Sequence, residues 1–437
     1  MRTLPFAAAA IVLLGAGVAK AVELHGAGST FIAPLMDGWI NYFDQSQPDI
    51  VIRYDAIGSG QGVARFQSGA IDFGATDNYV PAAEAPGRER GTVELPSAAG
   101  MIVLAYNLPG LKGRLNLPRD VYVDIFRGKI RTWDDPRIVA ANAGLKLPPI
   151  SIATVVRQDS SGTTYAFTDH LAAISTEWAA KPGVGKTIEW PHVAMLARGN
   201  EGVASKIRIS QGAIGYIEYS FALRLGLAMA ALENKAGKFV APTPLSGAAA
   251  LEPSSTADLD TLDKSTLDPT GAKAYPIVTY SWFLFHRSYP KEQGAGAAAF
   301  LDFALDEGQS YAPFFGYLPL PAPVAERAKA VVGQVWAANG VQAAAPSPGA
   351  PVTDASPAKA SAETAPRGSV APPRSPAPAS AYTVGGGETL QAIAMKLYRD
   401  PARWRDIVAA NPGVDLRHLH AGQVIKLPVA IGADRAP

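Results

Sequence analysis

The feature that most constrains the fold is a stretch at residues 341–380, where alanine, proline and serine replace large apolar side chains. It contains no aromatic residue, so it cannot bury enough surface to fold, and its repeated prolines favour an extended backbone. We therefore predict an Ala/Pro-rich disordered linker, with a maximum reach on the order of 100 Å. It separates a large body, from residue 22 to about 340, from a small module at 382–428.

The N-terminus has the pattern of a secretory signal. Arg2 precedes an apolar run at 4–18, and Ala-Lys-Ala at 19–21 is a small-x-small cleavage site. The alternative is a membrane anchor, but the apolar run is shorter than the roughly 20 residues that a spanning helix needs. We predict a signal peptide at residues 1–21 and a periplasmic protein.

Charge and cysteine content exclude several function classes. The 39 basic residues nearly balance the 38 acidic ones, so bulk charge does not attract nucleic acid, and we predict no nucleic-acid partner. The chain has no cysteine, which excludes a disulfide framework, a thiol nucleophile and a cysteine-based zinc site. We also expect no cofactor and no metal site.

The body has the alternating pattern of an α/β protein. Short apolar runs that are typical of strands are separated by longer stretches with helical periodicity, which favours largely parallel sheets. The strand-like runs lie at 22–24, 51–54, 101–106, 150–156 and 277–285, and examples of the helical stretches lie at 34–43 and 164–174.

Three strand-to-helix turns are rich in Gly, Ser and Thr: GAGSTF at 26–31, GSGQG at 58–62, and RQDSSGTT at 157–164. Small residues let backbone N–H groups approach a ligand, and the amino end of a helix favours an anion. The third turn adds Arg157, which can grip two oxyanion oxygens, and Asp159, which can orient that guanidinium.

Each turn taken alone is equally consistent with a capped helix, a flexible glycine loop or a surface ion pair. Together they supply many donors and few apolar groups, which suits a small tetrahedral oxyanion. A nucleotide site is disfavoured, because the chain has neither G-x-x-x-x-G-K-[ST] nor a dinucleotide-binding fingerprint.

Asp77, in the segment DFGATD, is an unusual residue for an anion site. A carboxylate repels a bound anion unless that anion carries a proton to share. Phosphate carries one at neutral pH and sulfate does not, so Asp77 would select phosphate against sulfate. The alternative is a solvent-facing loop carboxylate.

These segments resemble the periplasmic phosphate-binding proteins that feed the phosphate ABC importer. The motifs GAGSTF, AIGSGQG, DFGATD and RQDSSGTT occur in that family's order, and GKIRTWDDPRI, LPPISIATVVR and GAIGYIEYSFAL extend the resemblance over residues 22–335. Two departures are Ser160, where glycine is usual, and Ile32, where proline is common. By this resemblance, phosphate is held by Thr30, the backbone of Phe31, Ser59, Asp77, Arg157, Ser161, the backbone of Gly162, and Thr163, with Asp159 pairing with Arg157.

The resemblance also implies a two-lobe type II periplasmic-binding-protein fold that closes on its ligand by a hinge. Lobe I would comprise 22–104 and 278–340, and lobe II would comprise 105–277, with crossovers near 104–106 and 276–280. The implied partners are inorganic phosphate and an ABC permease in the inner membrane, and we expect a monomer.

Residues 382–428 have a β-α-α-β pattern and resemble a lysin motif, LysM, which binds glycans such as peptidoglycan. The matching elements are YTV, GETL, Trp404, the pattern I-x-x-x-N-P at 407–412, and AGQVIKLP. The family usually has aspartate at the position of Glu388 and proline among the glycines at 385–387. The alternative is a structural or protein-interaction module. By analogy the glycan groove would include Gly387, Glu388, Thr389, Leu390, Asn411 and Pro412.

Three rival functions stay open at this point. A phosphatase needs a metal cluster or an activated nucleophile, but the six histidines are scattered and neither H-E-x-x-H nor G-x-S-x-G occurs, so we predict that the chain is not an enzyme. The others are a binding protein for a different oxyanion and a wall-associated phosphate-scavenging protein. The histidines are His25, His170, His192, His286, His418 and His420.

Overall fold

A computed structural model describes the chain at 21–79, 91–191 and 194–338, and in part from 381 to 427. In that last part the described residues are 381–384, 390, 393, 394, 397, 407, 410, 411 and 422–427. The predicted linker and, except for Ala21, the predicted signal peptide lie outside the described residues. The chain divides into two compact units, Met1–Ser347 and Pro348–Pro437.

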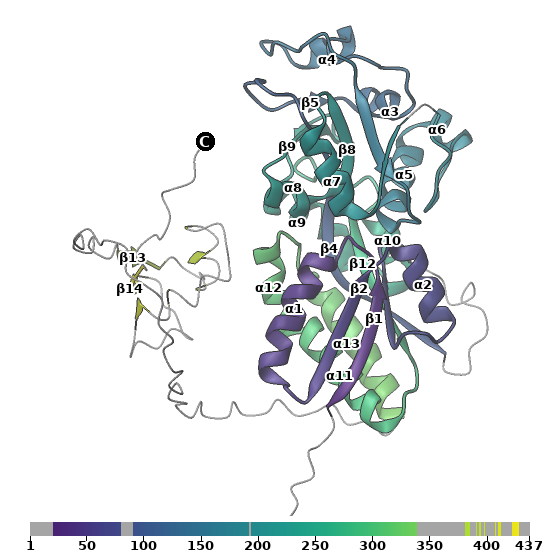
Figure 1. Ribbon diagram of the computed structural model, residues 1–437, viewed down its shortest axis with the longest axis vertical. Coiled ribbons are helices and arrows are strands. Elements are labelled where there is room, and N and C mark those ends of the chain that lie inside the picture. Colours follow the sequence, from purple (N-terminus) through teal and green to yellow (C-terminus); the bar gives the residue numbers. More distant parts are fainter. Residues whose placement is uncertain are drawn as a thin grey trace, which may run out of the picture. The chain divides into compact units, whose positions relative to one another are not determined.

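The large unit is organised by a nine-stranded sheet with the strand order β2-β1-β3-β12-β4-β8-β6-β7, in which β9 also pairs with β4 (Figure 1). The long strand β4 (Thr92–Tyr106) runs through both halves of this sheet. It pairs antiparallel with β12 (Val278–His286) as far as Met101, and antiparallel with β8 (Ala213–Glu218) from Ile102 onward. The Ile102 N–H donates to the Ile277 carbonyl at 2.9 Å, so the two segments that join the halves lie side by side.

The first half, lobe I, contains three mutually parallel strands whose apolar face is covered by amphipathic helices. Helix α1 buries Leu35, Trp39 and Phe43, which are four residues apart and therefore share one face. Phe73 stacks on Phe285 with ring centroids 5.3 Å apart, at the centre of this core. The elements of lobe I are β1 (Val22–Gly28), α1 (Ala33–Ser46), β2 (Ile50–Ala56), α2 (Ser59–Gln67), β3 (Phe73–Thr76), β12, α11 (Lys291–Leu305), α12 (Glu307–Tyr311) and α13 (Ala322–Ala338).

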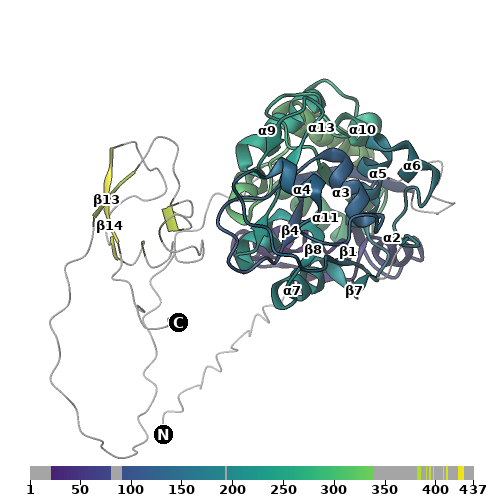
Figure 2. The ribbon, with the colours of Figure 1, turned by 90° about the horizontal axis from the view of Figure 1, so that it is seen from above.

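The second half, lobe II, repeats this plan around the parallel strands β6, β7 and β8, and Tyr216 lies at the centre of its core, stacked on Phe167 at 4.5 Å. Figure 2 shows this lobe in front, with α3 and α4 nearest the viewer. A small sheet, β11-β10-β5, lies apart from the main one. The elements are β5 (Asn116–Leu117), α3 (Arg119–Phe126), α4 (Pro136–Ala141), β6 (Ala153–Arg157), α5 (Gly162–Ile174), α6 (Thr176–Ala180), β7 (Met195–Ala197), α7 (Gly199–Ile209), β8, α8 (Tyr219–Leu225), β9 (Ala228–Met229), β10 (Ala231–Glu233), β11 (Phe239–Val240), α9 (Pro244–Leu251) and α10 (Leu262–Ser265).

The predicted α/β fold with two lobes is confirmed, with strands close to all five predicted runs. In the nine-stranded sheet the antiparallel pairs all involve β4 or β12, because these strands carry the chain between the lobes and run against their neighbours. In the small sheet β10 and β11 are also antiparallel. Strand β4 changes partner between Met101 and Ile102, three residues before the predicted end of the first lobe I segment at 104. The lobe boundaries given above remain our proposal. In the described ranges, every helix is too short or too polar to cross a bilayer.

The small unit has its own core. Strand β13 (Ala381–Thr383) pairs antiparallel with β14 (Val424–Lys426), and helical backbone occurs between these strands at Leu390, Ile393 and Ile407. These three side chains pack with four other apolar residues in a separate cluster that excludes water. The other members are Val384, Ala394, Ile425 and Leu427.

Candidate functional site

The three predicted turns meet where the two lobes face each other. In lobe I the Gly58 N–H donates to the Gly28 carbonyl at 2.8 Å, which holds the second turn against the first. Across the gap, the Gly60 N–H donates to the Ser160 carbonyl of lobe II at 3.1 Å. Gly62 must be small, because a Cβ there would lie 2.3 Å from the Cα of Gly28. Donor groups that are more than 100 residues apart in sequence therefore face one site.

Asp77 follows the last residue of β3 and is only 2% exposed. Its carboxyl accepts hydrogen bonds from three serine hydroxyls: Ser29 at 2.5 Å, Ser281 at 3.0 Å and Ser59 at 3.3 Å. Burial raises the pKa of Asp77 to about 6, against the lowering effect of these hydroxyls and of the Arg157 charge. This carboxyl therefore changes charge within a physiological pH range.

Arg157, the last residue of β6, has a side chain that is 2% exposed and is held by Asp159. Its Nε donates to Asp159 Oδ1 at 2.7 Å, and one terminal nitrogen donates to the other carboxylate oxygen. The other terminal nitrogen lies 3.4 Å from Thr163 Oγ1. Burial opposes the ionisation of Asp159, but the hydrogen bonds and charge of Arg157 outweigh it and hold the pKa of Asp159 below its ordinary value. The site thus contains a permanently charged, oriented guanidinium.

The amino end of α5 adds further donors from lobe II. Ser161 caps the helix, accepting from the Thr164 N–H at 3.1 Å, and both Ser161 and Thr163 are fully buried. A Cβ on Gly162 would lie 2.5 Å from Ser59 Oγ and 2.7 Å from the Asp77 nitrogen. Only glycine allows this helix end to approach lobe I so closely.

The first turn places Thr30 and Phe31 on the lobe I side. The N–H of Phe31, expected to face the anion, donates instead to Ser29 Oγ at 2.9 Å, so a ligand must compete with that hydroxyl. The Phe31 carbonyl accepts from the Tyr317 hydroxyl at 2.5 Å, and the Phe31 ring is fully buried. Thr30 Oγ1 contacts Asn200 of lobe II.

A cleft of about 880 Å³ extends from this site between the lobes. Its walls include Thr30 and Asp159, together with the exposed arginines Arg198 and Arg224. Within the described residues, no group of three or more His, Asp or Glu side chains is arranged to hold a metal ion. The chemistry of the site is that of an oxyanion receptor with one titratable acceptor.

Comparison with known proteins identifies the family. The model of the PBP superfamily domain matches residues 15–307. Phosphate-binding protein PstS from Xylella fastidiosa (strain 9a5c) is 36% identical over 315 residues, covering 71% of this chain and 85% of that protein. The chain belongs to the PBP superfamily and, within it, to the PstS family. PstS from Haemophilus influenzae is likewise 36% identical, over 71% of this chain and 92% of that protein.

Solved structures support the family fold. A high-affinity periplasmic phosphate-binding protein (PfluDING), solved with bound phosphate, superposes with a TM-score of 0.57 at 20% identity, covering 71% of this chain and 93% of that chain. A phosphate-binding protein from Stenotrophomonas maltophilia gives a TM-score of 0.56 at 20% identity, with 71% and 94% coverage. These similarities concern the two-lobe fold of the PstS-like body.

Beside this PstS-like body, the model of the LysM domain matches residues 382–428, so the small unit is a LysM domain. Two of its six predicted groove residues are described, and both are buried. Leu390 lies in the core, and the Asn411 amide donates to the carbonyls of Ile407 and Lys426 and accepts from the Lys426 N–H, each at 2.7 Å. Their side chains thus stabilise the module and have little left to offer a glycan. The others, Gly387, Glu388, Thr389 and Pro412, lie outside the described residues.

Sequence reasoning missed three polar residues of the PstS-like site: Ser29, Ser281 and Asn200. Ser29 lies inside the first glycine-rich turn, and its hydroxyl was the available signal. Ser281 lies in the middle of β12, 204 positions from its partner Asp77. Asn200 is the second residue of α7, directly after the turn that follows β7, and the Gly-Asn pair at 199–200 was the available signal.

Proposed function

We propose that this protein is an exported solute-binding protein that captures inorganic phosphate between its two lobes and delivers it to an ABC permease in the inner membrane. Membership of the PstS family supports the proposal, because its relatives are named phosphate-binding proteins. The proposed function is binding without turnover, so no residue is assigned a catalytic role.

The proposed ligands come from both lobes and are mostly donors. Arg157 supplies two positive N–H vectors, and Asp159 orients it. Hydroxyls and backbone N–H groups would surround the remaining oxygens, and because Ser59, Ser161 and Thr163 are buried such hydrogen bonds would be strong. The proposed set is Thr30, Phe31, Ser59, Asp77, Arg157, Ser161, Gly162 and Thr163.

The observation that carries the assignment to phosphate is the buried Asp77 carboxyl among these donors. With its pKa at about 6, Asp77 is ionised at neutral pH and acts as an acceptor. Monohydrogen phosphate brings the hydrogen that this acceptor requires. Sulfate brings none, so two negative oxygens would face each other without a proton between them.

Isothermal titration of the mature full-length chain with phosphate and with sulfate, at about pH 7.5, tests this proposal. We expect tight phosphate binding and no measurable sulfate heat. Tight sulfate binding without phosphate heat would instead favour a receptor for another oxyanion. Phosphatase turnover that is lost in Arg157→Ala would favour an enzyme.

The LysM domain suggests a second activity. We propose that it binds peptidoglycan and that the chain is a periplasmic monomer after removal of residues 1–21. Deleting residues 341–437 tests whether the phosphate-binding body and the LysM domain act independently. Phosphate affinity should be unchanged, while sedimentation with peptidoglycan should be lost. A large loss of phosphate affinity would contradict independent modules and favour a protein in which the wall-binding part dominates function.

A further inference from the structure

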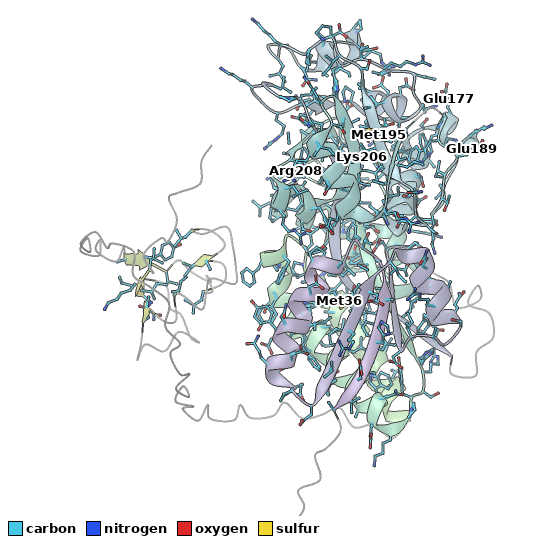
Figure 3. The ribbon with its side chains drawn as sticks, in the orientation of Figure 1. Met36, Glu177, Glu189, Met195, Lys206 and Arg208 are labelled. Carbon is cyan, nitrogen blue, oxygen red and sulfur yellow. The ribbon has the colours of Figure 1, made fainter. Side chains whose placement is uncertain are left out.

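Asn200 is a fully buried amide at the amino end of α7 in lobe II, and its side chain contacts two proposed phosphate ligands. Its Nδ2 donates to Thr30 Oγ1 at 3.1 Å and to Thr163 Oγ1 at 3.2 Å. Its backbone N–H also donates to Thr30 Oγ1, at 3.2 Å. One asparagine therefore contacts a hydroxyl of each lobe. Figure 3 locates α7 by its labelled residues Lys206 and Arg208.

The orientation of this amide is determined by the backbone of β8. The Glu218 N–H donates to Asn200 Oδ1 at 2.9 Å. A backbone N–H can only donate, so the carbonyl side of the amide must face Glu218 and the NH₂ group must face the two threonines. Both amide hydrogens are thus committed to the hydroxyl oxygens.

This arrangement determines what the two hydroxyls can do. A threonine oxygen has two lone pairs and one hydrogen. Thr30 Oγ1 accepts two N–H groups of Asn200, and Thr163 Oγ1 accepts one from Asn200 and one from Arg157, at 3.4 Å. With both lone pairs occupied, each hydroxyl can only donate its hydrogen elsewhere. A bound anion is the partner that such a donor suits.

We propose that Asn200 is a positioning residue that makes the Thr30 and Thr163 hydroxyls obligate donors to the bound oxyanion and holds the lobes together around it. This inference rests on the proposed phosphate-binding function. It assigns Asn200 an effect on affinity and on the rate of phosphate release, without direct contact with the ligand.

Two substitutions separate this role from a purely structural one. Asn200→Asp keeps the shape and the acceptor for the Glu218 N–H, but its carboxylate takes the hydrogens of both hydroxyls and adds negative charge. Asn200→Ala removes the amide and leaves the hydroxyls free to donate. We expect phosphate affinity to fall by about 100-fold or more in Asn200→Asp and by about 10-fold in Asn200→Ala, with faster release in both. A purely structural role predicts that the melting temperature falls together with phosphate affinity in both variants, because the buried charge of Asp and the cavity left by Ala each destabilise the fold.

Asn142→Ala is the matched control. Asn142 is also buried in lobe II and makes three hydrogen bonds, each 2.8 Å long, to Asn116 and Ile138. Its loss should lower the melting temperature and leave phosphate affinity unchanged. A Thr30→Val, Asn200→Ala double-mutant cycle should be non-additive, because either change breaks the same contact between the lobes.

The measurements are titration calorimetry with inorganic phosphate, stopped-flow phosphate release and thermal unfolding of every full-length variant. Equal phosphate affinity in wild type and both Asn200 variants, or a larger loss in Ala than in Asp, would overturn the inference. If Asn200→Asp does not fold, Asn200→Ala and the double-mutant cycle still test the inference. Additive losses of phosphate affinity in that cycle would contradict it. Absence of phosphate binding in the wild type would instead refute the proposed function itself.

Discussion

The two walls of the proposed ligand site each contain a carboxyl, buried in Asp77 and half-buried in Asp159, and the two carboxyls behave oppositely. On the lobe I wall, Asp77 is bonded by three serine hydroxyls, and burial raises its pKa to about 6. On the lobe II wall, Asp159 is paired with Arg157, which overcomes burial and lowers its pKa. With neutral hydroxyls as its partners, a shielded carboxyl has a raised pKa and can gain a proton near neutral pH, whereas a paired guanidinium keeps the carboxyl ionised.

This difference gives each wall a separate task. In our proposal the Arg157 guanidinium, oriented by Asp159, offers N–H donors whose charge does not change with pH and which attract any oxyanion. Asp77 can accept or lose a proton, which makes it sensitive to the protonation state of the ligand. Affinity should therefore depend mainly on lobe II and the choice between oxyanions mainly on lobe I. The following experiments test this division.

The largest effect is expected from Arg157→Ala. It removes the guanidinium and leaves the half-buried Asp159 carboxylate without its ion-pair partner, facing the anion. Phosphate affinity should fall by about 1000-fold, measured by calorimetry. Arg137→Ala is the control, because Arg137 pairs with Asp120 and Asp124 among exposed groups of lobe II. Equal phosphate affinities in these two variants would show that the Arg157 guanidinium is not needed for phosphate binding.

Asp77→Asn should change selectivity more than overall anion binding. The amide cannot accept the phosphate proton as a carboxylate does, but it can donate to sulfate. At about pH 7.5, phosphate affinity should fall by about 10- to 100-fold and sulfate binding should become measurable. If sulfate binding stays undetectable while phosphate binding is unchanged, the assignment of oxyanion selectivity to lobe I is wrong.

The same substitution should stabilise the ligand-free protein. The folded-state pKa of Asp77, about 6, lies above the ordinary value of 3.8, so its contribution to stability is complete below about pH 4 and is lost as the pH rises through about 6. At neutral pH Asp77→Asn should raise the free energy of unfolding by about 3 kcal/mol. Urea unfolding at several pH values measures this, and no gain at neutral pH would contradict it. Asp55→Asn, at an exposed carboxyl of the same lobe, should change stability by less than about 0.5 kcal/mol.

The smallest effect is expected from Ser281→Ala, which removes one hydroxyl from Asp77 and should raise the pKa of that carboxyl further. Phosphate affinity at about pH 7.5 should fall by about 5-fold. Ser97→Ala is a close control, because Ser97 is equally buried and donates to the Ser281 carbonyl at 2.9 Å without touching Asp77. Identical phosphate affinity in the two variants would exclude a role for the Ser281 hydroxyl in phosphate binding.

The sequence predicted those parts of the site whose groups lie within a few adjacent residues. Each glycine-rich turn shows in a few adjacent residues both the backbone freedom and the donors that an anion needs, so Ser59, Arg157 and Thr163 could be found. The pairing of Asp159 with Arg157 could be predicted because the two residues are two positions apart.

The remaining parts depend on tertiary structure. Ser281 looks like an ordinary polar residue in an apolar strand until β12 pairs with β3 and brings it to Asp77. Asn200 follows a strand of only three residues, too short for a clear pattern. The change of partner in β4 occurs inside a continuous buried run, so nothing in the sequence shows where lobe I ends.

The central claim is that Asp77 selects the oxyanion by its protonation state. The most direct measurement is the ratio of phosphate to sulfate affinity from about pH 8 to about pH 5, in wild type and in Asp77→Asn. In wild type the ratio should fall by about 10-fold per pH unit as the pH is lowered from about 8 to about 6, because the fraction of Asp77 that is protonated and can donate to sulfate rises by that factor, and it should level off below about pH 6, where most Asp77 is protonated. Asp77→Asn should show a low ratio without this inflection. The same inflection in both proteins would contradict the claim.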